Sequence, residues 1–192
     1  MKYLFVLLSL LFISNANAQS LPTGTKFSSF INNLKIANVD FVQTKNIPNL
    51  KRPFISKGKV KFERDKGFIW LQTEPYDFKF VSTKERYCTA DVNNSLSKLP
   101  HYSDFSELVD KVLVNDYSIL NSAFSVKYSE KQQNWEIVLE PKIDEIADIF
   151  KQITVTGNLD QLFEIKFEYV NNSIVTINFS HSKVVLNDEI SC

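Results

Sequence analysis

Apolar and polar side chains alternate along much of this chain with a period of two residues. In the run 58–64, Val60 and Phe62 fall on one face, and Lys59, Lys61 and Glu63 fall on the other. The same alternation recurs, in whole or in part, in the runs 39–44, 68–70, 78–80, 124–128, 135–139, 153–155, 163–169 and 175–179. Turns are expected at Lys66-Gly67, Gln132-Gln133-Asn134, Gly157-Asn158 and Asn171-Asn172. The pattern predicts a large antiparallel sheet with one aromatic-rich apolar face.

Three other segments repeat apolar residues with the period of a helix. The first follows Thr25 and contains Phe27, Phe30, Ile31 and Leu34. The second contains Phe105, Leu108, Val109 and Val112, after a capping box formed by Asp104 and Glu107. The third is a short turn after Pro141 with Ile143, Ile146, Ala147 and Phe150. Helices that interrupt a large antiparallel sheet indicate the α+β class.

The first eighteen residues have the features of a signal peptide. Lys2 precedes an apolar run at 4–13, and Ala16-Asn17-Ala18 places small residues at both recognition positions of a cleavage site. We expect cleavage after Ala18 and export of residues 19–192, which have the usual size of a single domain. No cysteine directly follows the cleavage site, which argues against a lipid anchor. An uncleaved membrane anchor is the alternative, but the apolar run is short for one.

Charge adds little to this picture, because 22 basic residues balance 22 acidic ones. We find no block of like charge suited to nucleic acid or to an anionic membrane, so neither is an expected partner. Two cysteines, Cys88 and Cys192, remain after export to a compartment that permits oxidation. They could form a disulfide or stay free, because sequence does not show whether they are close.

The sequence gives little support for a catalytic function. The chain has two histidines, His101 and His181, and neither stands in a recognisable spacing with Cys, Asp or Glu. With four glycines, it contains no glycine-rich phosphate loop. We therefore expect a protein that is not an enzyme, with no metal and no cofactor. Acyl-ester hydrolysis by an unrecognised constellation of residues is the disfavoured alternative.

Several short motifs occur in an order that resembles a known family. They are Phe41-Val42-Gln43-Thr44; then Leu50, Arg52-Pro53, Ser56 and Gly58; then Arg64 six residues before Trp70, and Pro75; and finally Leu139-Glu140-Pro141-Lys142. Each motif is weak alone, but their order and spacing are similar to those of the periplasmic lipoprotein carriers, the LolA-like proteins. The resemblance covers most of the exported chain. It implies a half-open antiparallel β-barrel whose helical lid covers an apolar cavity.

On this resemblance, the apolar strand faces line the cavity and the second helix forms the lid. The cavity residues are Phe41, Val60, Phe62, Phe68, Trp70, Phe78, Phe80, Trp135, Ile137, Ile165, Phe167, Ile177 and Phe179. The lid residues are Phe105, Leu108, Val109 and Val112. The alternative is that these side chains simply fill an ordinary core, which is the commoner fate of aromatic stripes.

Two arginines receive roles from the resemblance. Arg64 matches the family's arginine that bonds the backbone of the lid helix in the closed form, against the alternative of a solvated arginine at a strand end. Arg52 lies in a Leu-x-Arg-Pro motif that looks like LolA-like relatives rather than the principal carrier. It could contact an anionic head group or a partner, or have no ligand. On this motif the chain resembles a paralogue that carries another acylated molecule, and the alternative is the principal lipoprotein carrier.

The function implied is transport of an acylated lipoprotein or lipid towards the outer membrane. A sixteen-carbon chain loose in water costs on the order of 12 kcal/mol, so such a molecule needs shielding to cross the periplasm. By resemblance, the partners are an inner-membrane export complex and an outer-membrane acceptor, and we expect a monomer. The alternative is a periplasmic module of the same fold that senses lipoproteins.

Overall fold

The computed structural model describes residues 24–83, 87–90, 96–98 and 118–191. Its strands are β1 (Ile36–Asn46), β2 (Phe54–Glu63), β3 (Gly67–Glu74), β4 (Phe78–Thr83), β5 (Tyr87–Ala90), β6 (Leu96–Lys98), β7 (Phe124–Lys131), β8 (Asn134–Pro141), β9 (Phe150–Gly157), β10 (Leu162–Tyr169) and β11 (Ile174–His181). They form one sheet in the order β6-β5-β4-β3-β2-β1-β11-β10-β9-β8-β7. Every neighbouring pair is antiparallel.

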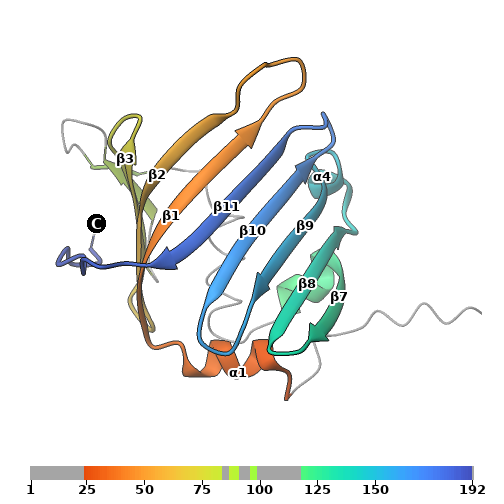
Figure 1. Ribbon diagram of the computed structural model, residues 1–192, viewed down its shortest axis with the longest axis horizontal. Coiled ribbons are helices and arrows are strands. Elements are labelled where there is room, and N and C mark those ends of the chain that lie inside the picture. The colour runs from red at the N-terminus through yellow and green to blue at the C-terminus, as the bar shows by residue number, and fades with distance from the viewer. Residues whose placement is uncertain (1–23, 84–86, 91–95, 99–117, 192) are drawn as a thin grey trace, which may run out of the picture.

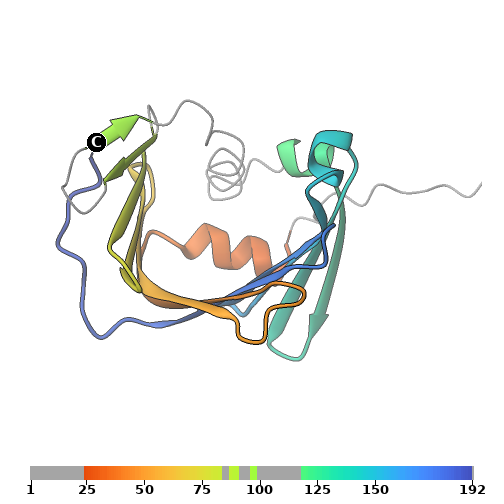
Figure 2. The ribbon, with the colours of Figure 1, turned by 90° about the horizontal axis from the view of Figure 1, so that it is seen from above.

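The sheet is open and strongly curved, with the profile of a U when it is seen from above (Figure 2). Its centre is the pairing of β1 with β11, in which Phe41 lies opposite Phe179 (Figure 1). β6 and β7 lie at the two edges, so the sheet does not close. The predicted antiparallel sheet is confirmed, and the half-barrel is an open one.

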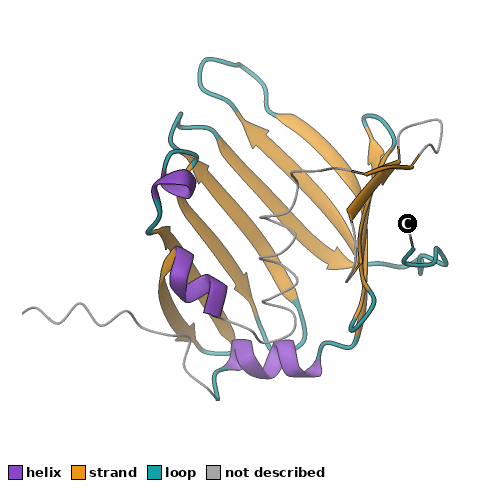
Figure 3. Cartoon of the chain, turned by 180° about the vertical axis from the view of Figure 1, so that it is seen from behind, coloured by secondary structure: helices purple, strands orange, loops and turns teal. Residues whose placement is uncertain are grey.

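Among the described residues, three helices accompany the sheet: α1 (Lys26–Asn33), α3 (Ser118–Ala123) and α4 (Asp144–Ala147). The predicted first helix is α1, and the Thr25 hydroxyl caps it by accepting a hydrogen bond from Ser28 N at 3.1 Å. Phe27, Phe30 and Ile31 of this helix are buried in the larger apolar cluster, and the helix lies across one end of the sheet (Figures 1 and 3). The predicted second helix lies outside the described residues.

The prediction for the third helix is partly wrong. α4 is a single turn with no buried residue, and Phe150, which we assigned to its apolar stripe, is the first residue of β9. The error arises because Ile143, Ile146 and Phe150 satisfy a helical period over a segment too short to bury a face. Strands β5 and β6 and helix α3 were not predicted.

The convex face carries a separate, smaller apolar cluster, in which Ile190 covers the fully buried Ile69 and Val81. The chain after β11 reaches them by crossing the convex face. Asp188 holds it there: its carboxylate pairs with Lys79 Nζ at 2.7 Å, and its carbonyl accepts from Lys61 Nζ at 2.8 Å. No helix in the described part of the chain is long and apolar enough to cross a membrane.

Candidate functional site

All thirteen predicted cavity residues point to the concave face, where they belong to two apolar clusters. In the larger cluster Phe41, Trp135, Ile137, Phe167 and Ile177 are buried, and Val60, Trp70, Ile165 and Phe179 are partly exposed at its margin. In the smaller one Phe62, Phe68 and Phe80 are buried beside Phe78. Alternation along each strand brings them together, because the two faces of a strand point to opposite sides. The concave face therefore carries large apolar side chains on both halves of the sheet.

Aromatic rings stack across the strands of this face. The rings of Phe41 and Trp70 have centroids 4.0 Å apart, and those of Phe68 and Phe80 are 5.7 Å apart. On the other half of the sheet, Phe150 contacts Tyr169 at 4.8 Å. Tilted ring pairs stabilise the fold by more than the area that they bury would suggest.

Helix α1 closes one end of the concave face, and Arg64 holds its C-terminal end. Arg64 follows β2, and its Nε donates to Leu34 O at 2.9 Å, while Nη2 donates to Ile31 O. Ile31 lies in the last turn of α1, where its carbonyl also accepts a hydrogen bond from Leu34 N at 3.2 Å, and Leu34 is the C-cap residue. Carbonyls at the C-terminal end of a helix are acceptors that a side chain can satisfy. Arg64 is thus a helix clamp, although the helix is α1. Whether it also bonds the predicted lid stays a prediction, because that segment lies outside the described residues.

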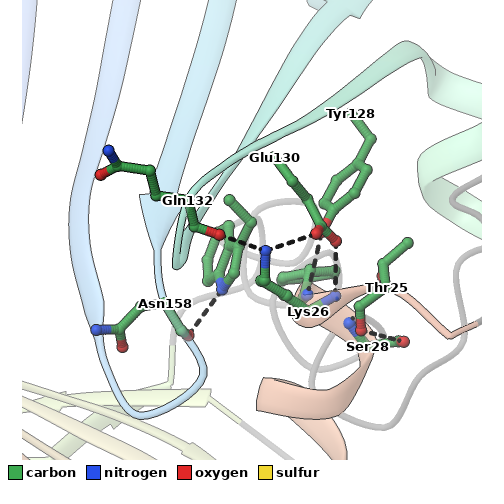
Figure 4. Close-up of polar contacts among 9 residues, drawn as sticks. Thr25, Lys26, Ser28, Tyr128, Glu130, Gln132 and Asn158 are labelled. Atoms are coloured by element: carbon green, nitrogen blue, oxygen red, sulfur yellow. Dashed lines mark hydrogen bonds and ion pairs between the residues drawn. The ribbon is translucent and has the colours of Figure 1, made fainter.

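The N-terminal end of α1 is held by the β7–β8 hairpin (Figure 4). Glu130 Oε1 accepts from the backbone N of Lys26 at 3.0 Å, and Glu130 Oε2 pairs with Lys26 Nζ at 2.8 Å. Lys26 Nζ also donates to Gln132 O at 2.6 Å, and the Tyr128 hydroxyl donates to Glu130. The two ends of α1 are therefore attached to opposite halves of the sheet.

These contacts shift the pKa values of two side chains, Glu130 and Tyr128. The hydrogen bonds from Lys26, followed by that from Tyr128, lower the pKa of Glu130 to about 2. Burial, followed by the hydrogen bond to Glu130, raises the pKa of Tyr128 to about 12. Glu130 is thus charged and Tyr128 neutral over the whole range in which proteins normally work.

The opposite end of the concave face carries Arg52. It is exposed in the β1–β2 connection, at the far end of β2 from Arg64, so the two arginines cannot act together. Cys88 is buried in β5 and takes part in a disulfide, whereas Cys192 lies outside the described residues, as do His101 and the four predicted lid residues. The described residues contain no cluster of His, Cys, Asp or Glu that could hold a metal ion.

Sequence reasoning missed the residues that hold the N-terminal end of α1. Lys26 and Glu130 are 104 positions apart, and no local pattern links them. The only signal was the position of Lys26 at the start of a helix, which does not identify a partner.

The sequence matches one known protein family. Residues 32–189 match the family model described as outer membrane lipoprotein carrier protein LolA. No curated protein matches the sequence. Solved structures with a similar arrangement include a LolA superfamily protein from Nitrosomonas europaea, with 7% identity, a TM-score of 0.43, and coverage of 83% of this chain and 93% of that one. Another belongs to the Pseudomonas aeruginosa MucA/MucB complex, with 8% identity, a TM-score of 0.46, and coverage of 87% and 58%.

Proposed function

The chain belongs to the LolA family, and we propose that it carries the acyl chains of a lipoprotein or another lipid through the periplasm towards the outer membrane. The observation that carries the proposal is the concave face. Large apolar side chains there, among them Val60, Trp70 and Phe179, stay partly exposed instead of being sealed in a core. Apolar surface of this kind in a concave setting is typical of a ligand site.

The energetics of transport suit such a surface. Shielding a sixteen-carbon chain from water is worth about 12 kcal/mol, enough to hold it without any specific bond. Release then requires an acceptor that offers an equally apolar environment. We propose that Phe105, Leu108, Val109 and Val112 cover the bound chain as a lid, and that Arg64 stabilises the closed arrangement.

The curved sheet gives this site a rigid wall. Because α1 is clamped to Arg64 at one end and to Glu130 at the other, it ties the two halves of the U together. Exchange of cargo is then expected at the opposite end, where the concave face is not crossed by a described helix (Figure 3). A monomer leaves that end free for partners at both membranes.

The proposal is tested by native mass spectrometry of the protein purified from its own periplasm, combined with displacement of a fluorescent fatty acid. Val60 and Val42 form a matched pair, because Val60 belongs to the concave cluster whereas Val42 is exposed. We expect Val60→Asn to weaken acyl binding about tenfold and Val42→Asn to leave it unchanged.

Circular dichroism is used to check that both variants are folded, because only folded variants can be compared in acyl binding. An acylated species bound to the purified protein supports the carrier role. A protein that is empty from the periplasm and does not bind the fatty acid would contradict it and would favour a module that senses lipoproteins through protein contacts alone.

A further inference from the structure

The hairpin formed by the end of β1, the start of β2 and their connection carries unpaired positive charge. Six basic residues and no acidic residue lie between Asp40 and Glu63: Lys45, Lys51, Arg52, Lys57, Lys59 and Lys61. Lys57, Lys59 and Lys61 are neutralised by Glu74, Asp40 and Glu63. Lys45, Lys51 and Arg52 are exposed and form no ion pair with any described residue. The zero net charge of the chain does not show this segment, because the acidic residues that balance it lie elsewhere in the sequence.

The same hairpin exposes large apolar side chains. Leu50 is 52% exposed, Phe54 is 58% exposed and Ile55 is 51% exposed. The reason is the register. β2 pairs with β3 only from Lys57 onwards, so residues 54–56 extend beyond that strand. In Figure 1 the β1–β2 connection projects past the neighbouring strand ends, at the end of the sheet opposite α1.

A defined turn shapes the tip of the hairpin. Leu50 N donates to Ile47 O at 3.2 Å, and Asn49 has a φ of 69° after Pro48. Proline in the second position and a left-handed asparagine in the third are the residues that a type II turn requires. The exposed groups are therefore presented by an ordered loop, which lowers the entropic cost of binding through them.

From these features we propose that the β1–β2 hairpin docks on the surface of an anionic phospholipid bilayer. Leu50, Phe54 and Ile55 enter the interfacial region, and Lys45, Lys51 and Arg52 lie among the lipid phosphates. Apolar insertion combined with basic residues is how short segments bind membrane surfaces. The inference does not depend on what the concave face carries.

The geometry favours a bilayer over a protein partner. Phe54 and Ile55 are consecutive in a strand, so their side chains point to opposite faces, and both are exposed. A protein surface would cover one face, whereas a lipid interface surrounds the tip. Docking in this way turns the open end of the concave face towards the membrane and α1 away from it.

Co-sedimentation with vesicles tests the proposal. The full chain is mixed with vesicles of phosphatidylglycerol and phosphatidylcholine, or of phosphatidylcholine alone. We expect binding to the anionic vesicles that weakens with added salt, and about a tenfold loss of affinity in Lys51→Glu/Arg52→Glu. The matched control is Lys131→Glu/Lys183→Glu, which makes the same charge change at exposed sites outside the hairpin. This control variant should bind the anionic vesicles more strongly than the hairpin variant does.

Insertion is measured separately with an environment-sensitive dye. A dye on Leu50→Cys should shift to the blue on addition of anionic vesicles, and a dye on Val184→Cys, which is 61% exposed in the wild type, should not. If the wild type does not bind these vesicles, or if the two double variants bind equally, the proposal is wrong. If the hairpin binds a protein partner instead, the wild type will not bind the vesicles. Failure of fatty-acid binding together with intact vesicle binding would refute the carrier function alone.

Discussion

Phe41 lies over Gly58, its partner in the neighbouring strand. A Cβ added at Gly58 would lie 2.7 Å from Cε1 of Phe41 and 2.0 Å from the carbonyl oxygen of Leu71. Trp135 covers its own partner, Gly157, in the same way, with Cζ2 2.4 Å from the added atom. In both halves of the sheet an aromatic ring thus fills the space of a missing side chain. Both rings are almost fully buried on the concave face.

Gly58→Ala should destabilise the fold by ~2–3 kcal/mol, because the new methyl group meets a backbone oxygen that cannot move freely. The measurement is chemical denaturation, with Ser129→Ala at an exposed strand position as the control. An alanine at 58 that costs less than about 0.5 kcal/mol would show that the close approach is not maintained in solution.

Arg64→Leu should cost about 2–3 kcal/mol of stability, since it removes a charged donor from the Leu34 and Ile31 carbonyls. Arg64→Lys should recover only part of the loss, because an ammonium group lacks the fork that reaches both acceptors. Arg52→Leu changes an exposed arginine and should leave the free energy of unfolding unchanged. Equal effects of the substitutions at 64 and 52 would contradict the clamp.

Glu130→Gln should be less stable than the wild type at neutral pH and equally stable in strong acid. Because the native pKa of about 2 is below the ordinary 4.5, the charged carboxylate stabilises the fold above pH 4.5. That contribution decreases as the pH falls from 4.5 and is lost below 2. Melting temperatures of both proteins across this range provide the test. Parallel curves for the two proteins would exclude the linkage.

We expect Cys88 to be paired with Cys192, the other cysteine of the chain. The support is the path of the C-terminal segment: Ile190 packs on Val81, and Val81 lies opposite Cys88 between β4 and β5. A bridge between these cysteines closes a loop of about a hundred residues, which should stabilise the fold by about 4.7 kcal/mol in the chain-entropy model. Peptide mapping under non-reducing conditions identifies the bridge, and reduction should lower the melting temperature. Alkylation of either cysteine in the unreduced, unfolded protein would refute the pairing.

Much of the sheet could be predicted because each strand carries its own signal. Alternation identified all the long strands and the apolar side of each, and the turn residues Gln132 and Asn172 adopt the positive φ that hairpins require. β5 and β6 were not predicted because they are too short to show a clear alternation. The third helix was misjudged because Phe150 fits a helical period and a strand period equally well.

The candidate site also has a part that could be predicted from the sequence and a part that could not. Which apolar side chains share the concave face could be read from alternation, since every residue assigned to the cavity joins one of the two clusters there. That these residues line a lipid cavity stays a prediction. The polar groups that hold α1 could not be derived from local pattern. Arg64 was identified only through resemblance, and Lys26, Tyr128 and Glu130 not at all.

Sequence by itself determined the period of each element and hence which side chains share a face, because these depend on neighbours two to four residues away. Only the tertiary structure decided that β1 pairs with β11, that α1 ties opposite halves of the sheet together, and that Ile190 returns to cover Val81. It also decided which basic residues are neutralised, leaving Lys45, Lys51 and Arg52 exposed together at one end. Such relationships join positions far apart in the chain, and they arise from burial and charge pairing summed over the whole fold.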